Sequence, residues 1–565
     1  MLMRTKVTLV AVALAASWCA GADDCALRRK YIGHGWDLLA VTPEEVLAHA
    51  DEFDRTGLDG VTLMPRVTAP DGRVGPRLAP MDGKVWTRDE LKGLIPVFRD
   101  IVRHRGLRES FLFAMWAPPK RLAWTNDAAW ASFAANMGTM AWLAKEGGLR
   151  GLLVDPEDYP RARQYRRLTS DPAYDETARL ARARGAQVGA AMFREFPDMA
   201  FLSFWWLSVR PNYFTSDTPC ADARTQGDLW PAFVNGLLDA LPPGACFVDG
   251  NEHAYRYEAE RGDFFKSATF QRARALPLIA PENRAKYRAQ GRAGFGLYLD
   301  CYINPTNSPW YFGPVHGSRT RHFELNLEQA TQAADEYIWI YGEKRPWVSW
   351  RKADAKRVAR FTKEGTWDAC IPGLYDVMGR LKDPAGWLAE NMDRLLASSD
   401  RVNRAAEKYG VWQDDRLNKG KFAVDHTCGD GDSESLRIDG TGNGCYTFHV
   451  DGVTTGEVYA VEVSVRGENV SVTASWQLKG RWQWGIPSVS VPVPEGAPDA
   501  WRRARGLVRV PAGVDRFVVL LSARLEPDAH AWFDNLRVYR LGSAGEEARA
   551  KNGERYTQSA DGTIP

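Results

Sequence analysis

Four carboxylic acids in this sequence each follow a short apolar stretch, a position from which they can exchange protons with a bound molecule. They are Asp155, Glu157, Glu252 and Glu343. Tyrosine or tryptophan lies close to each of them along the chain. Cleavage of a glycosidic bond needs two carboxyl groups that flank the anomeric carbon, one to protonate the leaving oxygen and one to attack carbon or activate water. Acids and aromatic rings in this pattern indicate acid/base chemistry on a sugar.

The sequence leaves three assignments of roles open. In the first, Asp155 is the nucleophile or charge stabiliser and Glu252 is the proton donor. In the second, Glu157 is the acid/base group and Glu343 is the nucleophile. In the third, Asp155 and Glu157 act together on an N-acetyl sugar, one orienting the amide and the other donating the proton. A structural role, such as capping a helix or pairing with an arginine, competes with each of these readings.

Aromatic and polar residues near the same apolar stretches are predicted to bind the substrate. The flat apolar face of a pyranose can stack on an aromatic ring, and polar side chains can bind its hydroxyl groups. The predicted substrate-binding residues are His34, Trp36, Asp37, Trp116, Trp205, Trp206, Asp249, Asn251, His253, Tyr298, Asp300 and Trp347. Packing between helices and strands competes for the aromatic members of this set.

The elements that must position these residues are eight short apolar strands that alternate with helical patterns. The strands are predicted at 30–37, 60–65, 111–116, 151–155, 200–207, 246–249, 294–300 and 337–341. Continuous apolar runs are typical of parallel strands that are covered on both faces. The alternation predicts an α/β fold, a (β/α)8 TIM barrel whose C-terminal strand ends form the active-site face. An open doubly wound sheet is the alternative, but the glycine-rich phosphate loop it would favour after strand one is missing.

Two helix starts are marked by capping boxes. Thr42 precedes Glu45 by three residues, and Thr87 precedes Glu90 by three. Each threonine is expected to cap a helix start. Pro96 lies inside the second helical pattern and is expected to kink it.

The pattern changes after a polar stretch at 413–420, which we interpret as a linker. Short alternating segments separated by Gly, Pro and Asp turns predict an antiparallel β-sandwich of the jelly-roll type. The predicted organisation is an export signal at 1–22, a barrel at 23–412, the linker, a sandwich at 421–542 and a polar flexible tail at 543–565.

The first 22 residues are typical of an export signal. A basic start precedes an apolar run at 7–16 that is too short to span a membrane, and a small-residue cleavage site follows. We therefore expect a secreted or periplasmic protein without a transmembrane segment. Trp18 is too bulky to precede a lipidated Cys19, which disfavours a lipoprotein. The net charge of +2 gives no support for a nucleic-acid partner.

The chain has 8 cysteines, and no Cys/His spacing resembles a zinc site. Export permits disulfides, and Cys428 and Cys445 flank a predicted hairpin, which makes them the best candidate pair. Cys246 and Cys301 fall in predicted strands and are expected to be buried thiols.

The acids at 428–434 alternate with other residues, as oxygen ligands of calcium often do. The twelve-residue calcium loop is incomplete because Thr441 stands at its last position, so a solvated turn is favoured over a structural Ca²⁺ ion. We expect no other cofactor and no catalytic metal.

Residues 30–350 resemble the TIM-barrel glycoside hydrolases as a broad group. The run Asp-Pro-Glu-Asp-Tyr-Pro at 155–160 is similar to the strand-four signature of chitinase-like barrels, which ends Asp-x-Glu-Tyr-Pro. Here Asp158 stands where that family has its glutamate, and the earlier aspartate is missing, so that family is not assigned. Residues 422–541 resemble jelly-roll carbohydrate-binding modules, whose last strand often reads Trp-Phe-Asp-Asp/Asn, as at 532–535.

Taken together, these features predict an exported glycoside hydrolase that acts on a polysaccharide or glycan. The sandwich is expected to bind sugar or to brace the barrel. The first alternative is a non-catalytic glycan-binding protein on a barrel scaffold, and the second is a lyase or a metal-dependent hydrolase. The sugar, the linkage, the stereochemical outcome and the oligomeric state are left open.

Overall fold

The computed structural model describes residues 29–67, 79–158, 162–210, 213, 215–315, 317–351, 356, 358–359, 362–363, 365–396, 401–403, 409–413, 421–440 and 444–541. The predicted export signal, most of the predicted linker and the predicted tail lie outside the described residues. The chain divides into two compact units between Met378 and Gly379.

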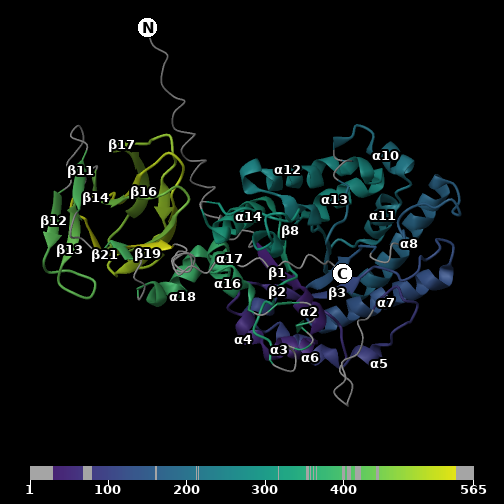
Figure 1. The fold of residues 1–565 in the computed structure, drawn as a ribbon. Helices are drawn as coiled ribbons and strands as arrows, with labels where there is room; N and C mark the ends of the chain where they lie inside the picture. The colour runs from purple at the N-terminus through teal and green to yellow at the C-terminus, as the bar shows by residue number, and fades with distance from the viewer. Residues whose placement is uncertain are drawn as a thin grey trace, which may run out of the picture. The chain divides into compact units, whose positions relative to one another are not determined.

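The first unit is mixed α/β and is built on nine parallel strands in one nearly closed sheet (Figure 1). In sheet order the strands are β7 (Gly291–Ala293), β6 (Cys246–Asp249), β5 (Ala200–Ser203), β4 (Gly151–Asp155), β3 (Phe111–Met115), β2 (Gly60–Leu63), β1 (Lys30–Gly35), β9 (Tyr337–Gly342) and β8 (Phe295–Tyr298). Gly294 alone separates β7 from β8, which stand at the two ends of this order. The predicted parallel pairing is confirmed.

β4 and β6 match their predicted extents, whereas β1, β2, β3 and β9 end one or two residues away from the predicted positions. The fifth and seventh predicted strands differ more. β5 ends at Ser203, before the predicted end at residue 207, because the N–H groups of 206–208 donate to the Asp249 carboxylate and not to a neighbouring strand. The predicted seventh strand, 294–300, corresponds to β8 and ends at Tyr298, because Leu299–Tyr302 form a 3₁₀ helix. β7 lies before the predicted range.

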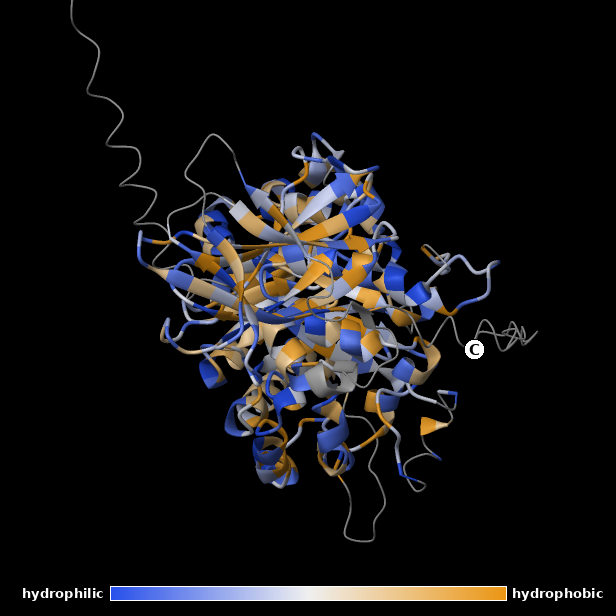
Figure 2. Ribbon diagram, turned by 90° about the vertical axis from the view of Figure 1, so that its left-hand side faces the viewer, coloured by the Kyte–Doolittle hydropathy of each residue, from blue (hydrophilic) through white to orange (hydrophobic). Residues whose placement is uncertain are grey.

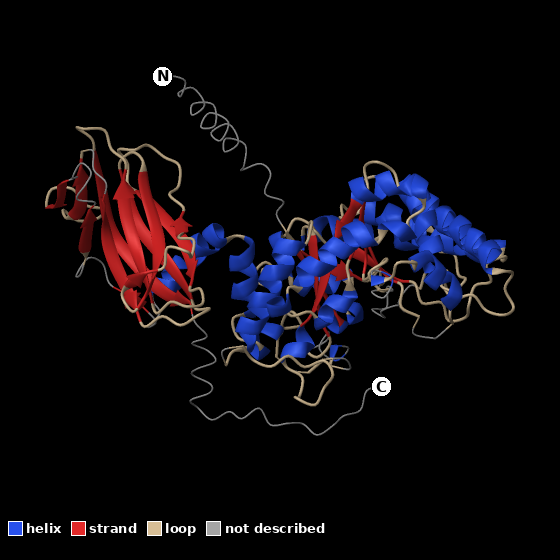
Figure 3. Ribbon diagram, turned by 90° about the horizontal axis from the view of Figure 1, so that it is seen from above, coloured by secondary structure: helices blue, strands red, loops and turns tan. Residues whose placement is uncertain are grey.

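Helices surround this sheet (Figure 3). They are α2 (Trp36–Ala40), α3 (Pro43–Ala48), α4 (Ala50–Phe53), α5 (Arg88–Leu91), α6 (Leu94–Ile101), α7 (Asp127–Glu146), α8 (Tyr174–Glu195), α10 (Pro219–Gln226), α11 (Trp230–Ala240), α12 (Asp263–Thr269), α13 (Arg284–Gln290), α14 (Arg319–Ala333), α16 (Trp367–Cys370) and α17 (Leu374–Lys382). No helix of the described residues has the length and apolar character needed to cross a bilayer.

Both predicted capping boxes are confirmed, one at the start of α3 and one at the start of α5. The expected kink at Pro96 is wrong. α5 ends at Leu91 and α6 begins separately at Leu94. Pro96 therefore lies in the first turn of α6, where the missing N–H of a proline breaks no helical hydrogen bond.

Helices α8 and α11 approach each other closely through two glycines. A Cβ atom on Gly185 would lie 2.1 Å from the carbonyl oxygen of Phe233, and one on Gly236 would lie 1.9 Å from that of Arg182. These helices connect β4 to β5 and β5 to β6. Their contact therefore fixes the spacing of the strands that carry the predicted acids.

The second unit consists of two six-stranded antiparallel sheets. The first sandwich sheet contains β12 (Lys421–Asp425), β13 (Ser435–Asp439), β21 (His530–Leu541), β15 (Val458–Arg466) and β19 (Arg502–Arg509), with β10 (Arg401–Asn403) paired to β21. The second sandwich sheet contains β11 (Gly410–Gln413), β14 (Gly444–Asp451), β20 (Arg516–Ala523), β16 (Val470–Leu478) and β17 (Arg481–Trp482), with β18 (Val489–Val491) paired to β16. Helix α18 (Pro384–Leu396) packs Trp387 and Leu388 against Ala460 and Tyr539.

The sandwich core comes from alternate residues of its strands. Tyr446, Phe448 and Val450 of β14 are buried in one apolar cluster with alternate residues of β16 and β20. Hydrophobic and hydrophilic colours accordingly alternate along the long strands in Figure 2. Strands β10 and β11 pair with this unit although they begin before residue 413, so the antiparallel pairing starts ahead of the predicted linker.

The predicted disulfide between Cys428 and Cys445 is wrong, because both thiols are free. Cys428 lies between β12 and β13 of the first sandwich sheet and accepts a hydrogen bond from Arg466 at 3.2 Å, whereas Cys445 lies on β14 of the second sheet. The two sulfurs thus belong to different layers. Cys301 is buried as expected, whereas Cys246 is half-buried. Desolvation raises the pKa of the Cys246 thiol to about 11 and that of Cys301 to about 12.

Replacing Gly236 with Ala is expected to lower the free energy of unfolding by about 2 kcal/mol, because the added methyl group must push α8 and α11 apart. Gly93→Ala is the matched control, since no atom lies within 4 Å of a Cβ built there. Calorimetric unfolding of the full chain measures both variants. Equal stabilities for the two would contradict the proposed close packing of these helices.

Candidate functional site

Three of the four predicted acids lie at or just after the C-terminal ends of strands β4 and β6. Asp155 is the last residue of β4, and Glu157 follows two positions later. Glu252 opens the short helix η2 (Glu252–Arg256), which follows Asp249 at the end of β6. Parallel strands end at the same edge of a sheet, so all three acids belong to its C-terminal end.

Asp155 is held rigidly at this edge. Its side chain is only 2% exposed. Its Oδ1 accepts the N–H of Glu157 at 2.9 Å, and its carbonyl oxygen accepts the N–H of Trp116 at 2.6 Å. These bonds fix the turn that carries Glu157 and tie the end of β4 to the residue that follows β3.

The pKa of Glu252 lies far above that of an ordinary glutamic acid. Burial is the main cause that raises its pKa to about 9, and the negative charges of Glu157 and Asp155 add to the effect. A hydrogen bond with the side chain of Trp205 acts in the opposite direction. Its N–H donates to the carbonyl oxygen of Phe204 at 3.0 Å, which anchors η2 to the loop after β5. Glu252 therefore carries a proton at neutral pH, beside two other carboxyl groups.

A second acidic pair lies after β8 and β9. The N–H of Glu343 donates to Oδ2 of the fully buried Asp300 at 2.8 Å, and the hydroxyl of Tyr341 donates to Oε1 of Glu343 at 2.9 Å. Burial, with the charge of Glu343 adding to it, raises the pKa of Asp300 to about 7, while Lys344 lowers it. Glu343 also forms a hydrogen bond with Tyr298.

Three tyrosines, here called the tyrosine cluster, connect the loops that carry the two groups of acids. They are Tyr255, Tyr298 and Tyr341. The ring of Tyr255 lies 5.0 Å from that of Tyr298 and 5.8 Å from that of Tyr341, and the last two rings are 5.4 Å apart. Trp36 donates its Nε1–H to the hydroxyl of Tyr341 at 2.7 Å. The cluster joins the loop of Glu252 to the end of β9.

Sequence analysis missed Tyr255 and Tyr341, although both had a signal. Tyr341 precedes Glu343 by two residues, and residues two apart on a strand face the same side. Tyr255 follows Glu252 by three residues in a 3₁₀ helix, where side chains three apart eclipse each other. Each tyrosine could have been found from its acid.

Asp249 is predicted to bind substrate, but its carboxylate binds backbone N–H groups of neighbouring loops. Its carboxylate accepts the N–H groups of 206–208 at 2.9–3.0 Å and that of Asn251 at 3.3 Å, and it also accepts the hydroxyl of Ser208. Both oxygens are used. Asp249 therefore shapes the loop after β5, which carries Trp205.

Asp37 also makes structural contacts. It accepts the N–H of Trp347 at 2.8 Å and the Nε1–H of Trp350 at 3.2 Å, and burial raises its pKa to about 6. These bonds tie the start of α2 to the segment after β9.

Three predicted indoles are fully buried: Trp116, Trp206 and Trp347. Trp116 and Trp206 pack with each other and with Phe201, while Trp347 donates to the carbonyl oxygen of His34 at 3.2 Å. Their position is that of core residues. Trp205 differs, because it contacts Glu252.

His34 is buried at the sheet's C-terminal end. Its Nδ1 lies 2.7 Å from the hydroxyl of Thr62, and its ring stacks at 5.3 Å on Tyr341. Burial lowers its pKa to about 3. The imidazole is therefore neutral and supports the tyrosine cluster.

The remaining two predicted residues follow β6. Asn251 is buried in the left-handed backbone region at φ 42° and donates to the hydroxyls of Ser267 at 2.6 Å and Tyr257 at 3.3 Å. His253 is exposed and contacts the carbonyl oxygen of Val209 at 3.2 Å. The turn at Asn251 redirects the chain from β6 into η2.

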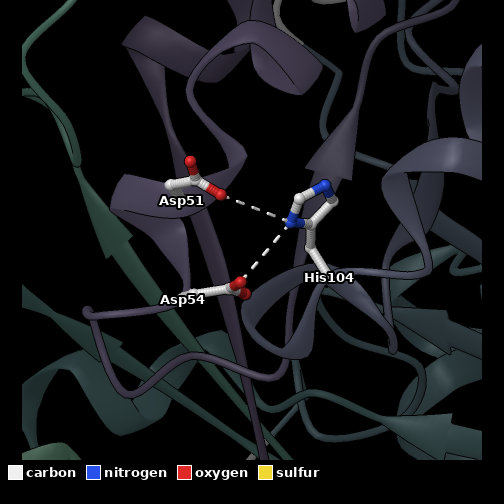
Figure 4. Close-up of side chains that lie close together, drawn as sticks. All are labelled: Asp51, Asp54 and His104. Atoms are coloured by element: carbon white, nitrogen blue, oxygen red, sulfur yellow. Dashed lines mark hydrogen bonds and ion pairs between the residues drawn. The ribbon is translucent and has the colours of Figure 1, made fainter.

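The described residues contain one group with metal-ligand spacing, Asp51, Asp54 and His104, whose ligand atoms lie within 4.8 Å of one another (Figure 4). His104 Nδ1 is 3.4 Å from Asp54 and 3.9 Å from Asp51. These residues precede β2 and β3 in the chain, so they belong to the N-terminal end of the sheet. They are separate from the acids described above.

The acidic run at 428–434 folds against Asp534 and Asn535 of β21. Asp430 donates its N–H to Asp534 Oδ2 at 2.7 Å and accepts the hydroxyl of Ser464 at 2.5 Å. Asp432 Oδ1 accepts the N–H of Glu434 at 2.9 Å, as in a turn. The preference for a solvated turn over a calcium ion at this place stays a prediction.

No protein-family model matches this sequence, and no curated protein matches it. Among solved structures, the CBM22-1 xylan-binding domain of Paenibacillus barcinonensis Xyn10C resembles 25% of this chain over 92% of its own length, with 13% identity and a TM-score of 0.20. The Clostridium thermocellum endo-1,4-beta-D-xylanase 10B, with CBM22-1 and GH10 modules, resembles 26% of this chain, with 9% identity and a TM-score of 0.21. Tailspike protein 4 of bacteriophage CBA120 resembles 25%, with 10% identity and a TM-score of 0.20.

The chain covers only 29% of that xylanase chain and 20% of that tailspike chain. Likenesses of this size assign neither a family nor a ligand to this protein.

The stability of the protein is expected to fall as pH rises between about 5 and 9, in part because Glu252 must ionise beside two carboxylates. The folded state holds this proton up to a pKa of about 9, whereas the unfolded chain releases it near 4.5. Glu252→Gln removes this ionisation, so the variant should be more stable than the wild type by at least about 1 kcal/mol at pH 9 and show no such gain at pH 4.

Thermal unfolding at both pH values measures the effect, and the surface variant Glu44→Gln is the control. A wild type and a Glu252→Gln variant with parallel pH profiles would contradict the carboxyl cluster.

Proposed function

We propose that this protein is an exported glycoside hydrolase in which Glu252 donates the proton and Asp155 acts from the other side of the anomeric carbon. The observation that carries the proposal is the raised pKa of Glu252, caused by burial and by the charges of Glu157 and Asp155. A general acid must hold a proton at working pH, and its partner must be ionised. The first of the three role assignments fits this division of labour.

The proposal includes a finer description of the fold. β7 and β8 are separated by one glycine and pair with β6 and β9. We take them as two halves of one bent strand, so that nine strands fill the eight positions of a (β/α)8 barrel. The acids then stand around one mouth, as in barrels whose active sites lie at the C-terminal end.

Each step of glycoside cleavage has a candidate residue. Glu252 gives its proton to the glycosidic oxygen as the bond to the anomeric carbon breaks. Asp155 attacks that carbon or stabilises its positive charge, and Glu157 lies on the same turn to orient water or a substrate amide. Trp205 holds Glu252 by a hydrogen bond. The tyrosine cluster and Glu343 offer hydroxyl and carboxylate groups to the neighbouring sugar.

Two rival functions lead to different outcomes. A non-catalytic glycan-binding protein has no need of a buried, protonated acid beside two carboxylates, which favours the enzyme. A metal-dependent enzyme would lose activity on treatment with a chelator. The proposed mechanism keeps its activity under that treatment. We assign the second unit an accessory role toward the same glycan.

Glu252→Gln is expected to reduce hydrolysis of a natural glycan by about 10²–10⁴-fold, because the leaving oxygen then departs without its proton. The loss should be much smaller on an aryl glycoside with an acidic leaving group, which needs little protonation. Asp155→Asn should abolish cleavage of both substrates. Hydrolysis rates on a glycan panel, with the product anomer determined by NMR, measure these effects.

Glu343→Gln and Glu157→Gln are the matched controls, because they test the second and third role assignments. Cleavage that persists in Asp155→Asn and Glu252→Gln but disappears in the two controls would transfer the chemistry to the other acids. Cleavage in all four variants would end the proposal.

A further inference from the structure

An exposed pair of indoles stands on the second unit, far along the chain from the acids. Trp484 is 77% exposed, the highest value among the large hydrophobic side chains that the structure describes. Its ring lies 5.2 Å from that of Trp482 at an interplanar angle of 20°, so the two rings stack. We call Trp482 and Trp484 the indole pair. An apolar surface of this size costs free energy in water unless something covers it.

The backbone holds the indole pair in a fixed position. Lys479 and Gly480 both have positive φ values, 49° and 75°, which is typical of the tight turn that joins two hairpin strands. Both carboxylate oxygens of Asp515 accept the N–H of Lys479, at 2.9 and 3.1 Å. After Trp482, the N–H of Gln483 donates to the carbonyl oxygen of Trp476 at 3.0 Å. The pair is therefore displayed by a braced hairpin.

A row of polar side chains leads from the indole pair across the second sandwich sheet. Direct neighbours in adjacent strands are Asp451, Arg516, Gln477 and Trp482. The residues next to them along the strands, including Val450, Phe517 and Trp476, are buried in the sandwich core. Side chains alternate between the two faces of a sheet, so the row and Trp482 share the outer face.

The polar groups of this row are held in place and balanced in charge. Arg516 pairs with Asp451, donates to Oε1 of Gln477 at 3.3 Å and lies 3.2 Å from Nδ1 of His449. Gln477 is only 4% exposed. A flat apolar ring beside fixed donors and acceptors suits a molecule with an apolar face and a rim of hydroxyl groups. The ion pair leaves little net charge for an ionic ligand.

We propose that the indole pair and this polar row form a binding surface for an uncharged pyranose polysaccharide. A sugar ring would stack on Trp484, and the hydroxyl groups of the next residues would bind Arg516, Asp451 and His449. This inference rests on the proposed function in one respect: the ligand is taken to be the polysaccharide that the enzyme would cleave.

The test is affinity electrophoresis of the full chain in gels that contain soluble xylan, mixed-linkage β-glucan or galactomannan. The experiment uses the Glu252→Gln background, so that the polysaccharides stay intact. Trp484→Ala and the double variant Trp482→Ala/Trp484→Ala are expected to weaken retention by about tenfold or more, which corresponds to one lost stacking contact. Raising NaCl from 50 to 500 mM should leave retention nearly unchanged, because stacking is not screened by salt.

Trp412→Ala is the matched control. Trp412 is 48% exposed and lies on β11, at the opposite edge of the same sheet. Along the strand direction, Trp412 lies about 20 Å from the row that contains Asp451. Across the sheet, β11 lies about 19 Å from β17. The control should therefore bind like the parent, and thermal melting shows that each variant is folded.

Three outcomes overturn the inference. The parent chain binds none of the three polysaccharides, the indole variants bind as tightly as the parent, or retention falls steeply with salt, which would favour an acidic ligand. Hydrolysis of a short aryl glycoside, measured in the wild-type background, reports on the proposed function separately. If the indole variants cleave the aryl glycoside normally but lose polysaccharide binding, the proposed binding surface is supported. If the wild type cleaves nothing but still binds polysaccharide through the indole pair, only the proposed hydrolase activity is disproved.

Discussion

The mutual repulsion of three carboxyl groups at one end of the parallel sheet is the constraint on which the candidate site depends. Asp155, Glu157 and Glu252 cannot all ionise cheaply where water is partly excluded. The fold places the proton on Glu252, where burial and the charges of Glu157 and Asp155 oppose ionisation. A site of this kind holds a proton on one acid beside the charges of two neighbours. Any change that lets water reach Glu252 would remove that distinction.

These acids stay close together only if the loops that carry them are rigid. Asp249 makes many of the hydrogen bonds that hold these loops. The four backbone N–H groups and the one hydroxyl that it binds turn the chain sharply after β5 and β6. The same turn brings Trp205 to Glu252 and starts η2. A carboxylate at a strand end thus serves the site without facing a substrate. It organises the loop on which the acid and its hydrogen-bond partner stand.

The sequence determined β4 and β6 to the residue, because each is a short apolar run that ends in an aspartate. It placed the end of β5 too late, since Trp206 and Leu207 continue the apolar run while their N–H groups bind a side chain 42 residues or more away. Local patterns do not reveal such long-range partners. The same limit explains the failed disulfide, because the predicted hairpin between the two cysteines does not form: β13 and β14 lie in different sheets.

The tryptophan content of the chain does not by itself indicate sugar binding. The chain has 22, and many of those described are core residues, with Trp116, Trp206 and Trp347 among the fully buried ones. Their number therefore follows from packing between helices and sheet, and it is weak support for sugar binding. What separates Trp484 is that nothing in the described fold requires an indole there, while a braced turn keeps it in water. A stacking surface for a sugar needs tryptophan side chains that are both exposed and rigid, and the number of tryptophans in the chain does not measure this. A mobile ring would lose conformational entropy on binding, and the stacking energy would have to offset that loss.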